Sequence, residues 1–128
     1  MIIKIHITKE VLALSAGCPG PGIDECKTNC AVAVAIRDLF PEAKVFQGST
    51  DLLGGHFDPY GFILDQTQHS DGLHEYIKQF DNSEYRERKE MPEATFDLTI
   101  PAYVIDKIGI GQAYKILSES KTLELVHP

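Results

Sequence analysis

The seven consecutive apolar residues that begin at Cys30 constrain the fold more than any other feature of this sequence. The run is rich in alanine, and Pro41 follows it closely. A helix that is apolar on all sides through its first two turns must be buried on most sides. We therefore predict a buried helix over residues 29–40, capped by Thr28 or Asn29, against which the rest of the chain packs.

Several short segments show the alternation of apolar and polar residues that is typical of half-buried strands. In residues 2–7, for example, Ile3, Ile5 and Ile7 share one face. The expected strands are residues 2–7, 43–47, 60–64, 95–100 and 123–125.

Helical signals lie between these strands. Thr8 is a good N-cap for a helix over residues 9–16, and Ser70 for a later helix. In the latter, the spacing of Leu73, Tyr76, Ile77 and Phe80 predicts one buried stripe. Two short helices are expected near the C-terminus, over residues 102–108 and around residues 113–117. The regular alternation of strand and helix found in doubly wound sheets is absent. We therefore predict a single α+β domain over residues 1–128, with a mostly antiparallel sheet packed against the buried alanine-rich helix.

The composition narrows the function classes. The formal net charge is −7, which disfavours a direct nucleic-acid binder and is compatible with binding a basic protein surface. No apolar stretch approaches the roughly 18 residues of a membrane span, and residues 2–7 favour a strand over a signal peptide. We therefore expect a cytoplasmic protein without a membrane partner. No cofactor is expected.

Three segments resemble a known group of proteins. These are the run from Asn29 to Asp38, the segment from Tyr76 to Asp81 that ends in Phe-Asp, and a later Phe-x-Leu strand at Phe96. Their order is similar to that in small uncharacterised proteins encoded by bacteriophages and mobile elements, over roughly residues 1–100. The resemblance implies an accessory protein that acts by binding a host protein, with components of defence systems among the candidates.

Cys30 is the sharpest candidate for catalysis. A cysteine in the first turn of a helix is stabilised as a thiolate by free backbone N–H groups and by the helix dipole. Thiol hydrolases and transferases also need a histidine as base and a group that orients it. His56 and Asp58 are the candidates for these roles. The alternative is that Cys30 is a small apolar residue of the core.

A zinc site is a further hypothesis. Cys18, Cys26 and Cys30 lie within thirteen residues, and His6 or His56 could complete a Cys₃His set. The sequence has no Cys-x-x-Cys pair, so the spacing is a weak match to known zinc sites. An odd number of cysteines in a reducing compartment does not favour a disulfide framework.

Two irregular segments, residues 17–28 and 81–92, are the predicted protein-contact regions. The first is rich in glycine and proline and contains Ile23, and the second holds a local basic cluster. The alternative for the second segment is a solvated connection. We expect the protein to bind a partner without catalysing a reaction. A homodimer remains an alternative. The predicted binding residues are Ile23, Tyr85, Arg86, Arg88 and Lys89.

Overall fold

The computed structural model describes residues 1–17 and 28–126, and it confirms the α+β class. Its strands form two separate three-stranded antiparallel sheets, where one main sheet was expected. In the first sheet, β1 (Ile2–Ile7) lies between β5 (Ala94–Thr99) and β6 (Leu123–Leu125). The predicted alternation is confirmed in β1, since Ile3, Ile5 and Ile7 are all buried.

The alanine-rich run forms α3 (Ala31–Ile36), which is buried as predicted but shorter than expected. Cys30 is its N-cap residue, so the prediction that Thr28 or Asn29 caps the helix is wrong. Beyond Ile36 the chain continues in tight turns, in which Phe40 donates its backbone N–H to the carbonyl of Ile36. The small side chains of α3 allow both β1 and α1 (Lys9–Ser15) to pack closely against it.

The second sheet differs from the prediction. It contains β2 (Lys44–Val45), β3 (Ser49–Asp51) and β4 (Gln66–Gln68) in that order. The predicted strand over residues 43–47 is therefore reduced to two residues, and the strand predicted over residues 60–64 is wrong. Those residues belong to an exposed loop, and polar residues on either side of the loop form the strands.

The remaining helices surround the sheets. In α4 (Asp71–Asp81), the Ser70 side chain accepts the Leu73 N–H, and the predicted stripe is buried. A short helix, α5 (Tyr85–Lys89), occupies the middle of the expected charged connection. Near the C-terminus, α6 (Ala102–Ile108) and α7 (Ile110–Glu119) are separated by a single glycine. No helix in the described part of the chain is long and apolar enough to cross a membrane.

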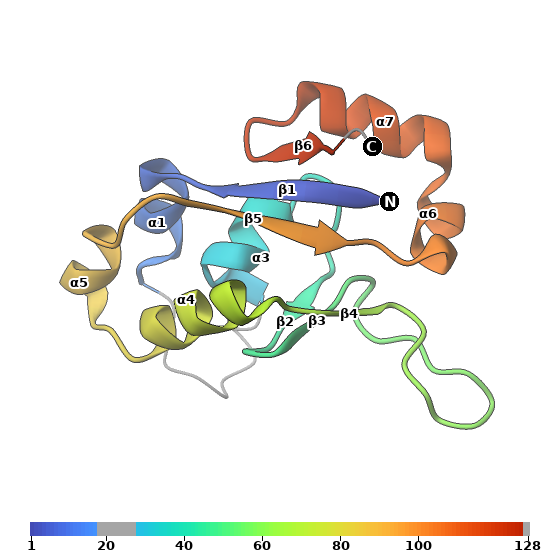
Figure 1. Ribbon diagram of the computed structural model, residues 1–128, viewed down its shortest axis with the longest axis horizontal. Helices are drawn as coiled ribbons and strands as arrows, with labels where there is room; N and C mark the ends of the chain where they lie inside the picture. Colours follow the sequence, from blue (N-terminus) through green and yellow to red (C-terminus); the bar gives the residue numbers. More distant parts are fainter. Residues whose placement is uncertain (18–27, 127–128) are drawn as a thin grey trace.

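Figure 1 shows α1 and α5 at one end of the molecule and α6 and α7 at the other. One buried apolar cluster includes residues of both sheets and of the helices between them. The segment between β3 and β4 extends away from this body. It is the part of the described chain that departs most from the compact arrangement.

Candidate functional site

Cys30 lies in an apolar part of the core between α3 and α4. Its side chain is 4 % exposed, and the small cavity beside it is lined by Ala31, Val32, Tyr76, Ile77 and Phe80. No histidine is among the described residues that line this cavity. The surroundings match the alternative that Cys30 is a core residue.

The two residues predicted to assist Cys30 have other roles. The backbone N–H of His56 donates to Oδ1 of Asp65 at 2.7 Å, and the His56 side chain is exposed. Oδ1 of Asp58 accepts the backbone N–H groups of Tyr60 and Phe62, each at 2.9 Å. The contacts of the described residues therefore do not bring Cys30, His56 and Asp58 together.

The predicted metal site cannot be assembled from the described residues. Cys18 and Cys26 lie outside residues 1–17 and 28–126, as does the predicted binding residue Ile23. Within those described ranges, no group of three or more histidine, cysteine, aspartate or glutamate side chains is placed to hold a metal ion.

The predicted basic contact cluster divides into exposed and buried members. Tyr85, Arg86 and Lys89 are exposed on α5, with the Lys89 ammonium 4.7 Å from the centre of the Tyr85 ring. Arg88 is 4 % exposed, and it donates to the backbone carbonyls of Phe80 and Ala16 at 2.9 and 3.1 Å. Arg88 therefore joins the ends of α4 and α1, and this burial removes it from the predicted contact surface.

The most distinctive surface feature was missed by the sequence reasoning. Residues 53–64, here called the aromatic loop, connect β3 to β4 and project from the body of the molecule (Figure 1). Phe57, Tyr60 and Phe62 on this loop are 63, 85 and 71 % exposed. Large aromatic side chains bury much area when they bind and are enriched in interfaces. Their grouping on one projecting loop makes this loop the candidate binding surface.

Asp65 fixes the base of the aromatic loop. Its Oδ2 accepts the backbone N–H groups of Leu53 and Gly55 at 2.6 and 3.1 Å, and its Oδ1 accepts that of His56. Burial alone would raise the pKa of Asp65, but these backbone hydrogen bonds outweigh burial and hold the pKa below its ordinary value. The backbone also closes the loop, because the Leu52 N–H donates to the Asp65 carbonyl at 2.9 Å.

Asp58 fixes the tip of the same loop. Besides the two hydrogen bonds to its carboxylate, its backbone N–H donates to the Phe62 carbonyl at 2.8 Å. Gly61 has φ +88°, a conformation that side chains rarely adopt, so a glycine is required in this turn. Between base and tip, Phe57 and Ile63 form an isolated β-bridge. The aromatic loop is therefore a segment whose backbone is held by hydrogen bonds and whose large aromatic side chains face solvent.

Asp51 lies beside this base and is poorly satisfied. The residue is buried, and its Oδ1 has no hydrogen-bond partner in the described structure. Burial raises the pKa of Asp51, the nearby Asp65 carboxylate raises it further, and Lys44 on the paired strand lowers it. Asp51 at the end of β3 and Asp65 just before β4 are therefore two neighbouring carboxyl groups whose surroundings shift their pKa values in opposite directions.

The side chain of His69, just after β4, contacts Thr50 in β3 and Gln47 just before β3. Its Nδ1 lies 2.9 Å from the Gln47 carbonyl and must carry the proton, so Nε2 accepts from the Thr50 hydroxyl at 2.7 Å. Burial lowers the pKa of His69, with a smaller contribution from His74, although the contact with Gln47 raises it. The neutral imidazole acts as a structural link in the polar sheet.

A hydroxyl–imidazole–carboxylate chain crosses the outer face of the first sheet. Nδ1 of His6 lies 3.0 Å from the Thr95 hydroxyl, and Nε2 lies 3.2 Å from a carboxylate oxygen of Glu124. The order matches that of a hydrolase triad, but the residues are cross-strand neighbours on an open, solvated face. These contacts therefore form a cross-strand hydrogen-bond network on the surface of the sheet.

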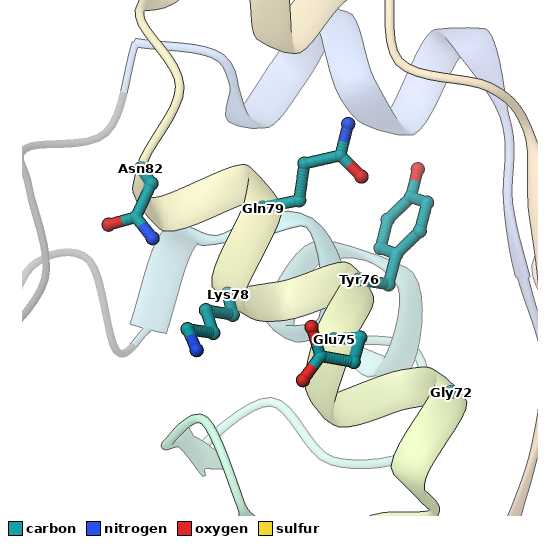
Figure 2. Close-up of a pocket in the computed structure, with 6 residues that line it drawn as sticks. All are labelled: Gly72, Glu75, Tyr76, Lys78, Gln79 and Asn82. Carbon is teal, nitrogen blue, oxygen red and sulfur yellow. The ribbon is translucent and has the colours of Figure 1, made fainter.

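Two hollows on the surface are poorer candidates than the aromatic loop. The first lies against α4, where Tyr76 and Gln79 point to one side of the helix and Glu75 and Lys78 to the other (Figure 2). The polar groups therefore do not converge. Tyr76 donates its hydroxyl to the Pro92 carbonyl, and burial raises its pKa to about 12.

The second hollow is a groove beside α1. Its apolar lining comes from Val11, Leu14 and Val34. Charges of both signs surround these residues, from Lys9, Glu10, Asp38, Glu93 and Lys121. The mixture gives the groove no clear preference for a ligand of one charge.

Comparison with known proteins provides no relative that would assign a function to any of these sites. Neither protein-family models, nor curated proteins, nor solved structures match this chain.

Proposed function

We propose that this chain is a protein-binding module that acts through the aromatic loop and does not catalyse a reaction. One observation carries the proposal: Phe57, Tyr60 and Phe62 are exposed on a loop whose backbone is held by Asp65 at its base and Asp58 at its tip. Exposed aromatic residues on a fixed backbone bind with a small entropic cost, because the loop does not need to be ordered on binding.

The biological setting of the proposal comes from the sequence resemblance. A small accessory protein of a phage or mobile element would meet its partner in the cytoplasm of the host bacterium. We propose that this partner is a host protein. Compact projecting loops of this length are frequently functional, which agrees with a binding role for residues 53–64.

The test compares the wild-type protein with a variant that carries Phe57→Ser, Tyr60→Ser and Phe62→Ser. Both are immobilised and used to capture proteins from a lysate of the host bacterium. The matched control carries Leu14→Ser and Ile110→Ser, which remove exposed apolar side chains elsewhere on the surface. All three proteins are first shown by circular dichroism to unfold at similar temperatures.

The proposal predicts that one protein is captured by the wild type and by the control and is lost with the loop variant. To locate the contact, Tyr60 is replaced by a photo-crosslinking phenylalanine analogue, and the crosslinked peptide of the partner is identified by mass spectrometry. Capture that is equal for all three proteins would overturn the proposal.

A further inference from the structure

The charge distribution around the aromatic loop indicates what kind of protein surface it fits. Residues 46–77 contain no lysine or arginine, although they make up a quarter of the chain. A basic residue near the base of the loop is Lys44, which pairs with Asp51 across β2 and β3. The same segment has five acidic residues, namely Asp51, Asp58, Asp65, Asp71 and Glu75. Asp51 and Asp65 are buried at the base of the loop, so Asp58 is the acidic residue within the exposed aromatic group.

Asp58 has one carboxylate oxygen committed to the loop and one available. Oδ1 accepts the N–H groups of Tyr60 and Phe62. No residue of the described chain donates a hydrogen bond to Oδ2, and no salt bridge to Asp58 is present in the described ranges. The acidic side chain of Asp58 therefore belongs to the same turn as the exposed Tyr60 and Phe62, whose backbone N–H groups it accepts.

Other occupants fit this surface less well. Nucleic acids and anionic membranes are bound through lysine and arginine, which residues 46–77 lack. A second copy of this chain also carries −7, and its groove beside α1 has more acidic than basic lining residues. A protein surface with an apolar pocket and a basic rim is complementary to the loop, since the pocket can hold the aromatic side chains and the rim can pair with Asp58.

We propose, building on the function proposed above, that the partner presents an apolar pocket for Tyr60 and Phe62 with an arginine or lysine at its rim that pairs with Asp58. The aromatic side chains supply most of the affinity by burial, and Asp58 selects pockets with a basic rim. An arginine in this place would also lie close to the ring faces, where cation–π attraction adds to the pairing.

The test uses Asp58→Asn, which removes the charge and keeps the loop. An asparagine oxygen can still accept the two backbone N–H groups, because aspartate and asparagine form the same type of turn. The captured partner is purified, and its affinity for the wild-type protein, Asp58→Asn and Tyr60→Ser is measured by calorimetry at low and high salt. Asp71→Asn is the matched control, since it removes an exposed acidic charge outside the loop.

The proposal predicts that Asp58→Asn weakens binding by about threefold to fivefold at low salt, and that this difference shrinks at high salt. Tyr60→Ser should weaken binding by about thirtyfold or more at both salt concentrations. Asp71→Asn should bind as the wild type does. The peptide crosslinked at position 60 should contain or adjoin a basic residue.

Two results would overturn this proposal alone. Binding that depends on Tyr60 but is equal for the wild type and Asp58→Asn would leave the loop as the binding element and remove the basic rim. Crosslinking to a surface without lysine or arginine would do the same. The absence of any loop-dependent protein partner would overturn the proposed function as well.

Direct assays cover the other occupants. Loop-dependent binding to phosphatidylcholine or phosphatidylglycerol vesicles, or to a single-stranded oligonucleotide, would contradict a protein partner. A loop-dependent dimer, measured by light scattering after gel filtration, would identify a second copy as the occupant and overturn the proposal.

Discussion

The two sheets of this protein are stabilised in different ways. In the first sheet, β1 buries three isoleucines against α3 and the neighbouring strands, so apolar burial supplies the stability. In the second sheet, the buried residues include Thr50, Asp51 and Thr67. The Thr50 hydroxyl bonds to His69, and the Thr67 hydroxyl donates to the Thr99 carbonyl of the first sheet. The first sheet therefore forms the body of the fold, and the second sheet supports the projecting aromatic loop.

The largest expected effect is the loss of apolar burial in the first sheet. Ile5 is fully buried in the central strand, so Ile5→Ala should lower the free energy of unfolding by about 3 kcal/mol through lost burial and the cavity left behind. Urea denaturation followed by circular dichroism measures this value. The exposed Ile2→Ala on the same strand is the control, with an expected change below about 1 kcal/mol. Equal losses for the two variants would contradict the described role of the first sheet.

A local effect is expected at the base of the aromatic loop. Asp65→Ala removes the acceptor of the N–H groups of Leu53, Gly55 and His56 and should destabilise this region by about 2 kcal/mol. Hydrogen exchange should accelerate at these three amides and leave those of β1 protected. Asp71→Ala serves as the control. An equal acceleration throughout the molecule would show that the second sheet is not a separate supporting region.

Replacement of Asp51 should stabilise the protein, whereas replacement of Asp65 should destabilise it. Because burial and the Asp65 charge raise its pKa in the folded state, folding favours the protonated form, and stability falls as the pH rises above about 3.8. Asp51→Asn removes the charge, so it should raise the free energy of unfolding at pH 7 by about 0.5–1 kcal/mol, even though the attraction of Lys44 is lost. Thermal melts at pH 7 check the sign. A destabilised Asp51→Asn protein would mean that the carboxylate has a favourable partner.

The smallest expected effect is the pH dependence due to His69. Since burial lowers its pKa in the folded state, the unfolded chain binds the proton more readily, and this contribution to stability is complete above pH 6.5 and lost below it. Melts of the wild type should therefore decline from pH 7.5 to pH 5, and those of His69→Gln should decline less. His56→Gln, at an exposed histidine, should follow the wild type. Identical pH profiles for His69→Gln and the wild type would refute the contribution of His69.

The sequence predicted the apolar parts of the fold more successfully than the polar parts. The alternation in β1, the stripe of α4 and the caps Thr8 and Ser70 follow from residue spacing and local hydrogen bonding, and the structure confirms them. The strands β3 and β4 have no apolar alternation, because Thr50 and Thr67 are buried through hydrogen bonds. Their formation depends on contacts between distant residues, which periodicity does not reveal.

The candidate site was harder to predict for the same reason. The segment over positions 57–64 has the composition of a buried strand, and its composition does not reveal that Asp65 and Asp58 satisfy the loop backbone. A usable signal was present, however. Gly54, Gly55, Pro59 and Gly61 punctuate this segment and argue against a regular strand. The burial of Arg88 had no comparable signal, since a basic residue in a charged segment is usually solvated.

The binding role proposed for the aromatic loop requires a fixed backbone in the free protein although the aromatic side chains face solvent. Backbone ¹⁵N relaxation of the uncomplexed wild-type protein measures whether the backbone is fixed. The hydrogen bonds of Asp58 and Asp65 predict order parameters of about 0.8 for the amides of His56, Tyr60 and Phe62, close to those of β1. Values below about 0.6 at these amides, with β1 still rigid, would show that the loop backbone is not fixed in the free protein.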